Sequence, residues 1–580
     1  MKTTRRELLK LGGAVAGTAT LFGLTGCNFQ NSGRSGDGTS SGAKAITVMG
    51  AQFPTLDPQI VGEGMWIDVQ GIFEGLVNQT DDGTDVQPGQ AEKWSMSDDG
   101  LTYTFTLRDG LQWSDGSPLT SDDFMFAYER LLTPQAAGAG VTLGANSYVS
   151  STNIKNATQF LAGSVTDFSQ VGIKATDEKT LEFTLASPNP GFLMGLAHPS
   201  MLPLPRKLLE AEPQDWEKAD KIISNGPFKV TGLTYNVRLD LAKNDKYWDK
   251  AKVGVDTIVL RQRASNDTSL VPFESGEVDV LQVGDPAGLI RFNQDPKLKP
   301  QLKAAKPGTI AYLALMHSKN ETLSDPRIRQ ALSLAMGRDT IAPAIPGNEP
   351  TGSLVPQSVP GWDPSDAITE DVDKAKQLLA DAGFPDGKGL PPINLLASSD
   401  QPLLPPMVAN WKKNLGVEAK IDAVEAGVYV KKRTAMNADD YIGFYFGTFG
   451  SELTWAKWVA SLWSPTFAKP FSLNAADFEQ YLAMQSDKSV KSSQLNQFAD
   501  QRCSAEVKEF DRLTTEAMAQ TEPDAATAAF KKAAKAREET YLFLPITMSS
   551  YRLAVNDRVT GFNPRPTGEK YYFKTLGVSA

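Results

Sequence analysis

The side chains that most often carry catalysis or bind metals are scarce in this chain of 580 residues. It contains two histidines, His198 and His317, and two cysteines, Cys27 and Cys503. Neither histidine has a second ligand-type residue at the spacing that metal sites use. Nucleophilic catalysis also needs a base beside the nucleophile, and histidine is the usual one. We therefore expect no metal centre, no cofactor and no enzymatic activity.

One segment formally matches the G-x-S-x-G motif of serine hydrolases. It is Gly38-Thr-Ser40-Ser-Gly42, but the motif works only between a strand and a helix. Residues 28–43 are rich in Ser and Gly, which favours a flexible tether instead. Paired carboxylates acting as in a glycosidase leave an exported hydrolase as the third alternative, although no motif places them.

Cys27 is the thiol whose neighbours indicate chemistry, namely covalent lipidation. Thr4-Arg5-Arg6 opens a segment that resembles a twin-arginine export signal. The apolar run after it, residues 11–26, is shorter than the roughly 20 residues that span a bilayer. Leu24-Thr-Gly26-Cys27 resembles a lipobox. We expect residues 1–26 to be a signal peptide and residues 27–44 a lipidated cysteine with a flexible linker; the alternative is a soluble exported protein with an accidental cysteine.

Composition limits the class of the folded part. The apolar content of 41% and charged content of 22% are typical of folded soluble proteins. A length of 580 residues exceeds what one hydrophobic core supports, so two or three domains are expected. The net charge of −10 argues against nucleic acid as a partner.

A strongly patterned stretch runs from Trp94 to Gly116. Leucine and aromatic residues alternate with threonine from Leu101 to Leu107, which predicts a strand with one buried face. A turn precedes it at residues 98–100, and Trp113 is expected to start a second strand of a hairpin.

Periodicity predicts the other elements. Helices are expected with apolar stripes and capping residues, the second with Ser121 or Asp122 as its N-cap and the third closed by Gly383. The expected helices are Met65–Val77, Thr120–Leu132, Asp371–Ala382, Leu403–Leu415 and Ala525–Thr540. The expected strands are Ile46–Met49, Val171–Ile173, Thr180–Leu185 and Val417–Ile421.

Several strings, in order along the chain, resemble one known family. They are Phe73–Val77, Trp94–Gly116, Ser224–Val230, Asn244–Trp248, Phe273–Val280 and Asp325–Leu332. Together the chain resembles the bacterial extracellular solute-binding proteins, family 5, which include oligopeptide- and dipeptide-binding proteins. The resemblance covers residues 45–560.

The resemblance implies an α/β, two-lobed periplasmic-binding-protein fold with an extra domain. Mixed sheets flanked by helices would form two lobes, joined by a two-strand hinge, that close over a ligand. It implies domain I in three parts, residues 45–80, 190–308 and 543–580. Domain II would span residues 81–189 and domain III residues 309–542.

In peptide-binding members of the family, an Asp in a Gly-Trp-x-x-Asp-Tyr segment holds the α-ammonium of the peptide. A buried ammonium needs such a partner. The matching segment here runs from Phe446 to Trp455, where Thr448 replaces the Trp and Ser451 replaces the Asp. Glu452, one position later, could supply the carboxylate after a local shift.

Aromatic residues and an N-terminal loop complete the predicted site. Trp455 lies in a short aromatic-rich helix and forms a wall of the cleft or packs within domain III. Glu63 and Trp66 occupy a loop that borders the cleft in the family; Glu63 contacts the ligand or is a solvated loop acid. The predicted ligand-binding residues are Glu63, Trp66, Ser451, Glu452 and Trp455.

The resemblance implies a monomeric receptor outside the cell membrane. It would be anchored to the outer face by lipid on Cys27, capture oligopeptides and deliver them to the permease subunits of an ABC importer. The second hypothesis is the same role for another solute such as an oligosaccharide, because the aspartate is replaced and aromatic faces stack on sugar rings.

Overall fold

The computed structural model describes most of residues 44–579, and these form a unit separate from residues 1–43. Residues outside the description are 1–43, 51–54, 61–65, 134–151, 264–268, 317–320, 436–442, 451–454, 461–463, 488, 567–570 and 580. The predicted leader, Cys27, Glu63, Ser451 and Glu452 therefore lie outside the described residues. Among the described helices, none has the length and apolar character needed to cross a bilayer.

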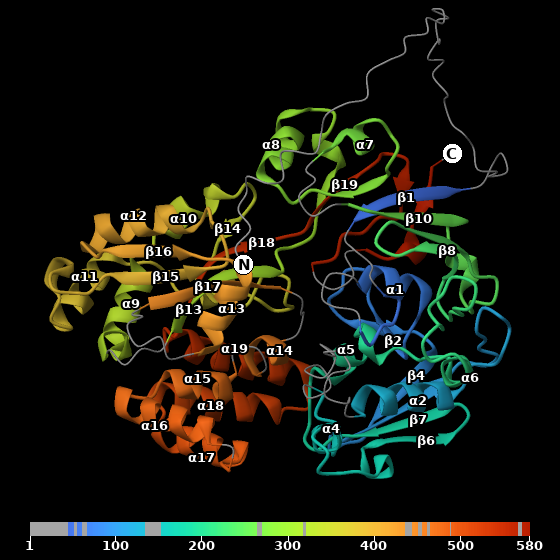
Figure 1. Cartoon of the computed structure of the whole chain (residues 1–580), viewed down its shortest axis with the longest axis horizontal. Helices are drawn as coiled ribbons and strands as arrows, with labels where there is room; N and C mark the ends of the chain where they lie inside the picture. The colour runs from blue at the N-terminus through green and yellow to red at the C-terminus, as the bar shows by residue number, and fades with distance from the viewer. Residues whose placement is uncertain are drawn as a thin grey trace, which may run out of the picture. The chain divides into compact units, whose positions relative to one another are not determined.

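The first sheet gathers seven strands from distant parts of the chain (Figure 1). Its order is β12-β19-β11-β1-β10-β9-β8. The central β1 is parallel to β10 and β11, whereas β9 and β19 run antiparallel to their neighbours, so the sheet is mixed. The strands are β1 (Ala45–Gly50), β8 (Phe228–Thr234), β9 (Arg238–Lys243), β10 (Thr257–Gln262), β11 (Val280–Gln282), β12 (Leu302–Ala304) and β19 (Arg552–Val555).

The second sheet has four antiparallel strands in the order β4-β5-β7-β6. They are β4 (Ala91–Met96), β5 (Thr102–Leu107), β6 (Ile173–Asp177) and β7 (Thr180–Thr184). Tyr103, Phe105 and Leu107 are buried, while the intervening threonines are half-buried. The alternation predicted for this strand is confirmed.

The pairing predicted for β5 is wrong. Its hairpin partner is the preceding β4, through the turn at residues 97–101, and β7 lies on its other side. Trp113 starts no strand; an isolated bridge joins Gln112 to Pro118. The buried ring of Trp113 instead packs edge-on against Phe73, with centroids 6.4 Å apart. A period-2 pattern identifies a strand but not its partner.

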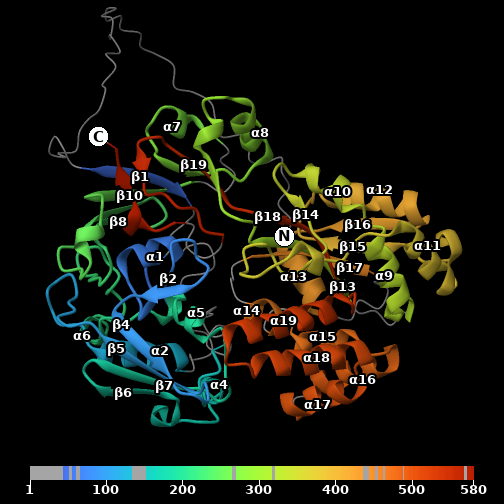
Figure 2. The same cartoon turned by 180° about the vertical axis from the view of Figure 1, so that it is seen from behind.

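The third sheet has six strands in the order β14-β18-β13-β17-β15-β16. They are β13 (Thr309–Met316), β14 (Glu349–Pro350), β15 (Ile393–Ala397), β16 (Ala419–Ala423), β17 (Gly443–Phe449) and β18 (Phe543–Ser549). Helices belong to the same lobe as this sheet (Figures 1 and 2). They include α9 (Pro326–Leu334), α11 (Val372–Asp381), α12 (Leu404–Leu415), α14 (Trp455–Ala460), α18 (Ala505–Met518) and α19 (Pro523–Glu538).

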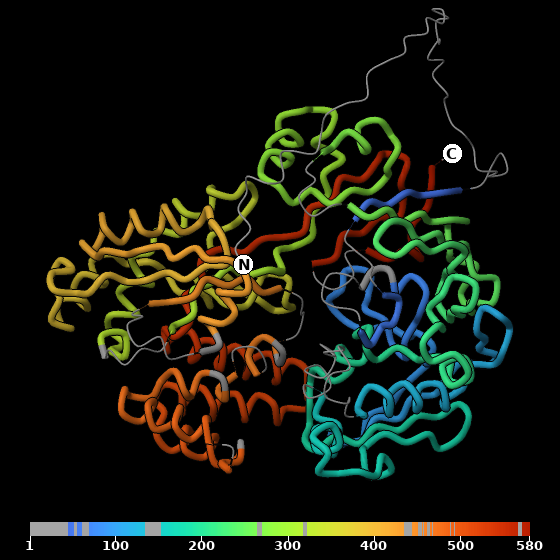
Figure 3. Tube along the Cα trace, viewed as in Figure 1, coloured from blue at the N-terminus to red at the C-terminus, as the bar shows by residue number. Residues whose placement is uncertain are grey.

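Hydrophobic burial divides the described chain into two lobes. One large core joins the seven-stranded and four-stranded sheets, and a second surrounds the six-stranded sheet. The chain passes between the two large sheets through short segments, residues 305–308 between β12 and β13 and residues 550–551 between β18 and β19 (Figure 3). The predicted boundary at residue 543 comes too early, because β18 pairs with β13 and β14; the return to the first sheet is at β19.

Most predicted helices form, with local differences at their ends. The helix α2 (Ser121–Leu132) is capped by Thr120, not by Ser121 or Asp122, and Asp123 completes a capping box. The helix α11 is followed by Gly383 at φ 93°, as its predicted role requires.

The helix α1 (Trp66–Ile72) ends well before the predicted Val77. The backbone beyond it bonds elsewhere: the carbonyl of Gly75 accepts from Gln90, and that of Leu76 accepts from Gly89 and Ala91. Tertiary hydrogen bonds therefore override the helical periodicity, and Val77 begins the short β2 (Val77–Gln79), which pairs with β3 (Val86–Pro88).

Candidate ligand-binding site

The loop predicted to hold the ligand joins β17 to α14 in the second lobe. Ser451 and Glu452 lie outside the described residues, but the residues that flank the loop on both sides are described. On one side, Phe449 pairs with Ile310 of β13 and packs edge-on against Trp458, with centroids 5.2 Å apart. On the other side, α14 begins at Trp455. The loop thus connects two fixed elements.

Trp455 is the one predicted site residue whose side chain is described. It is buried, and its indole nitrogen donates to the carbonyl oxygen of Pro360 at 2.7 Å. The ammonium of Lys531 lies 6.0 Å from its ring centroid. These contacts hold the ring within the second lobe; its predicted contact with a ligand stays a prediction.

The buried ion pair of Arg537 and Glu538 contacts α14 through the backbone of Trp458. Arg537 at the end of α19 donates from Nη1 to the carbonyl oxygen of the fully buried Trp458, and its guanidinium lies 3.5 Å from the carboxylate of Glu538. That carboxylate also accepts from the Ser353 hydroxyl at 3.0 Å and the Leu354 amide at 2.9 Å. Burial raises the pKa of Glu538 to about 7.

Tyr429 and Arg433 of α13 (Ala426–Ala435) form a further cluster with Tyr445 of β17. The hydroxyl of Tyr429 donates to the carbonyl of Phe446 at 2.7 Å. The guanidinium of Arg433 lies 5.5 Å from the ring of Tyr429 and 5.7 Å from that of Tyr445. Burial raises the pKa of Tyr445, so its phenol stays protonated.

The N-terminal loop predicted to border the ligand contains Glu63, which lies outside the described residues, as does the side chain of Trp66. The segment before it is firmly anchored. Arg130 of α2 forms a two-point ion pair with the buried Asp57, at 3.2 and 2.5 Å, and donates to Gln59 at 2.6 Å. Gln59 in turn donates to the carbonyl of Ala127 at 2.6 Å.

Glu217 fixes the same segment from another side. Its carboxylate accepts from the Thr55 hydroxyl at 2.5 Å and from the backbone amides of Leu56 and Asp57 at 2.5 and 3.0 Å. Burial raises the pKa of this carboxyl group despite those hydrogen bonds. The loop that carries Glu63 therefore starts from a segment tied to two other parts of the first lobe.

Three of the family strings meet around the carboxylate of Glu74, which is 4% exposed. One oxygen accepts from Asn78 at 2.8 Å and from the hydroxyl of Tyr247 at 2.6 Å; the other accepts from Gln90 at 2.8 Å and from the indole of Trp248 at 2.6 Å. Asn225 exchanges two hydrogen bonds with the backbone of Glu74. These strings therefore stabilise the first lobe and supply none of the predicted site residues.

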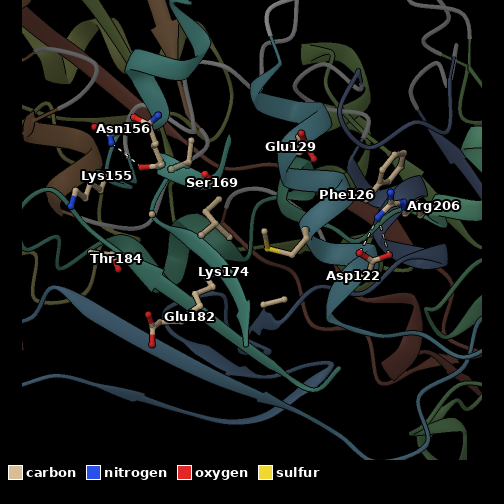
Figure 4. A pocket seen from close by; sticks show the side chains of 16 residues that line it. Asp122, Phe126, Glu129, Lys155, Asn156, Ser169, Lys174, Glu182, Thr184 and Arg206 are labelled. Carbon is tan, nitrogen blue, oxygen red and sulfur yellow. Dashed lines mark hydrogen bonds and ion pairs between the residues drawn. The ribbon is translucent and has the colours of Figure 1, made fainter. Parts of the chain in front are cut away.

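A cavity of about 910 Å³ lies beside α2 and β6 on the four-stranded sheet (Figure 4). Apolar side chains such as Met125 and Ile173 line it together with charges of both signs, including Lys174. Asp122 and Arg206 at its rim pair with each other at 3.0 Å. It contains none of the predicted ligand-binding residues.

The patterns in the sequence do not single out Asp57, Arg130, Glu74 or Glu217. Arg130 lies in the predicted helix Thr120–Leu132, and spacing alone gives it no partner. A signal existed for Glu74, because an acid inside the apolar run Phe73–Val77 needs donors when buried. No group of three or more His, Cys, Asp or Glu side chains in the described part of the chain is placed to hold a metal ion.

Two mixed α/β lobes, linked by two short crossings, define the two-lobed periplasmic-binding-protein fold. The sequence model of "Bacterial extracellular solute-binding proteins, family 5 Middle" matches residues 85–464, more than half of the chain. The chain belongs to this family of solute-binding proteins.

Relatives extend over most of the chain. It is 31% identical over 434 residues to the periplasmic oligopeptide-binding protein OppA of Salmonella typhimurium, covering 72% of this chain and 75% of that protein. It is 32% identical over 400 residues to the probable deoxycholate-binding periplasmic protein YgiS of Escherichia coli, covering 66% and 71%. The structure of the murein tripeptide-binding protein MppA in its unliganded open form matches with a TM-score of 0.72 at 22% identity, covering 93% of this chain and 98% of that one.

Proposed function

We propose that this protein is an extracytoplasmic receptor that captures oligopeptides and delivers them to the permease of an ABC importer. The observation that carries the proposal is the 31% identity with an oligopeptide-binding protein over 72% of this chain. Main-chain hydrogen bonds to an extended peptide give affinity with little sequence selectivity. The two lobes and their two crossings support a hinge-closure mechanism of capture.

The proposed site is the loop between β17 and α14 together with the loop before α1. Glu452 would bind the α-ammonium of the peptide, with Ser451 beside it and Glu63, Trp66 and Trp455 around the ligand. The described elements on either side support this proposal, because β17 ends at Phe449 and α14 begins at Trp455, which leaves a short segment for Glu452 between them.

The charge on Glu452 can be tested with two peptides of the same sequence, one with a free amine and one N-acetylated. Glu452→Gln should lower the affinity for the free-amine peptide at least tenfold, because a hydrogen bond to a charged group contributes about 1.5–3 kcal/mol. The acetylated peptide should bind both proteins alike. Glu516→Gln, at an exposed acid of α18, is the matched control. Equal losses for both peptides would remove Glu452 from this role.

The membrane anchor is proposed to be lipid on Cys27, after removal of residues 1–26, with residues 27–44 as the tether. Two acyl chains give stable anchoring where one does not. Cys27→Ser should move the protein from the membrane pellet to the soluble fraction of fractionated cells. A Cys503→Ser variant, at a buried thiol of the folded unit, serves as the control. Membrane retention of the Cys27→Ser protein would contradict the lipid anchor.

A second candidate is the same receptor role for a solute other than a peptide. It is favoured by the 32% identity with a relative named as probably deoxycholate-binding and by the replacement of the family aspartate at Ser451. Retention of a discrete non-peptide molecule by the purified protein would support it.

A further inference from the structure

A second cavity, of about 480 Å³, lies in the first lobe and is here called the Arg108 cavity. It is lined by α1, by the β2–β3 hairpin, by the residues that follow β5 and by residues 572–575 near the C-terminus. Its volume falls in the range of small-molecule sites. The lining residues used below are Gln70, Asn78, Asp81, Arg108, Asp249 and Lys574.

Arg108 is held in one orientation by two contacts. Its guanidinium carbon lies 3.6 Å from the centroid of the Trp248 ring, and its Nε donates to the carbonyl oxygen of Gly89 at 2.8 Å. The Trp248 indole is itself fixed by its bond to Glu74. Nη1 and Nη2 of Arg108 donate to no group in the described part of the chain. These two nitrogen atoms of a fixed guanidinium are therefore available to a ligand at the cavity.

Of the three acids that line the cavity, Asp249 and Glu74 are engaged with other groups, whereas Asp81 carries an exposed carboxylate. Asp249 pairs with Lys574 at 2.6 Å and with Lys252 at 3.2 Å. Both oxygens of Glu74 are occupied by the four donors described above. Neither carboxylate is paired with Arg108. An anionic ligand therefore does not compete with these two groups for the Arg108 guanidinium.

The unused atoms indicate the kind of ligand. A planar guanidinium donates two parallel hydrogen bonds to a carboxylate, with a match that an ammonium lacks. Gln70 and Asn78 use their amide nitrogens on Ala197 and Glu74, which leaves their carbonyl oxygens as acceptors. Asp81 adds a further acceptor. The lining therefore suits a small molecule with a carboxylate and hydrogen-bond donors.

We propose that the Arg108 cavity binds a small carboxylate, held end-on by Nη1 and Nη2 of Arg108, at a site separate from the loop between β17 and α14. This site is additional to peptide capture and depends on none of the residues assigned to it. Arg108, Trp248 and Glu74 come from three of the family strings, and the ligand would bridge them to the C-terminal segment that carries Lys574.

Titration calorimetry on the full chain in mild detergent tests the proposal, with succinate as the probe. Succinamide has the same backbone without charge and should not bind. Arg108→Gln should lower the affinity for succinate tenfold or more. Arg108→Lys should lower it less, since lysine keeps the positive charge but lacks the two parallel N–H donors of the guanidinium. Arg238→Gln, at an exposed arginine of β9 paired with Asp240, should bind succinate as the parent does.

Succinate that fails to bind the parent protein, or binds Arg108→Gln equally well, would overturn the proposal. If Arg108→Gln does not fold, judged by its thermal transition, a crystal of the parent protein soaked in succinate decides. Density for a carboxylate within hydrogen-bond distance of Nη1 and Nη2 supports the site. If the cavity stays empty at saturating succinate and Arg108 still stacks on Trp248, the role of Arg108 is structural only and the proposal is overturned.

Discussion

Replacing Glu74 by glutamine keeps the shape of the side chain and changes the chemistry at the centre of the first lobe. Each carboxylate oxygen accepts two hydrogen bonds, one pair from Asn78 and Tyr247 and the other from Gln90 and Trp248. In glutamine one of these oxygens becomes an NH₂ group, so two donors face a donor. The side chain is 4% exposed, so little solvent reaches the two donors that lose their acceptor.

The expected cost follows from that count. Two lost hydrogen bonds to a charged acceptor, at about 1.5–3 kcal/mol each, give a loss of about 3–6 kcal/mol in the free energy of unfolding. The hydroxyl of Tyr247 can turn and accept from the new NH₂ group, which places the expected value near the lower end. Tyr247→Phe alone should cost about 1.5 kcal/mol, and less in the Glu74→Gln background, because the hydrogen bond that remains there joins two neutral groups.

The assay must report on the first lobe, since a protein with two lobes need not unfold in one step. Hydrogen exchange in increasing urea, followed by mass spectrometry of peptides from β8 and β9, gives the free energy for that lobe. Glu178→Gln, an exposed acid in the β6–β7 turn, is the control. A loss below about 1 kcal/mol for Glu74→Gln, or strict additivity with Tyr247→Phe, would refute the proposed hydrogen-bond centre.

Two further predictions concern buried charges. Arg130→Met removes the partner of Asp57, which is 1% exposed, and should destabilise the first lobe by about 3–5 kcal/mol, measured by the same exchange assay. For Glu538, burial raises the pKa to about 7 from the ordinary value of 4.5. The folded chain therefore retains a proton that the unfolded chain loses between these values, and stability should fall as pH rises through this window. Glu538→Gln should remove that part of the slope, measured as melting temperature from pH 4 to pH 8.

Each of these predictions has its own control. Asp57→Asn combined with Arg130→Met should recover part of the loss, because the uncompensated carboxylate is gone; no recovery would show that Arg130 acts by packing alone. An exposed Glu516→Gln should leave the pH profile unchanged. If Glu538→Gln leaves it unchanged as well, Glu538 titrates near its ordinary pKa in the folded protein.

Local patterns predicted most elements, because their causes lie within a few residues. The strict alternation of Leu101–Leu107 marks β5, and Gly383 closes α11 where its positive φ is needed. Pairing depends on distant segments and was predicted less well. The β5 strand pairs with β4 and β7, and β18 joins the six-stranded sheet before β19 returns to the first.

The candidate site shows the same division. The resemblance to the family implies the loop after β17 and the loop before α1 as parts of the site, although Thr448 and Ser451 depart from the family pattern. The anchors of those loops were not predictable from spacing. Arg130 meets Asp57 across 73 positions of sequence, and Glu217 meets Thr55 across 162. Such contacts arise only when the fold brings distant strings together, and no periodicity reports them.

The most direct test of the central claim is native mass spectrometry of the unit Lys44–Ala580, purified gently from cells. A peptide receptor should retain a ladder of masses that fragment into short peptides, and these should be depleted in Glu452→Gln. One discrete non-peptide metabolite, or masses spaced by hexose units, would contradict peptide capture and assign the receptor to another class of solute.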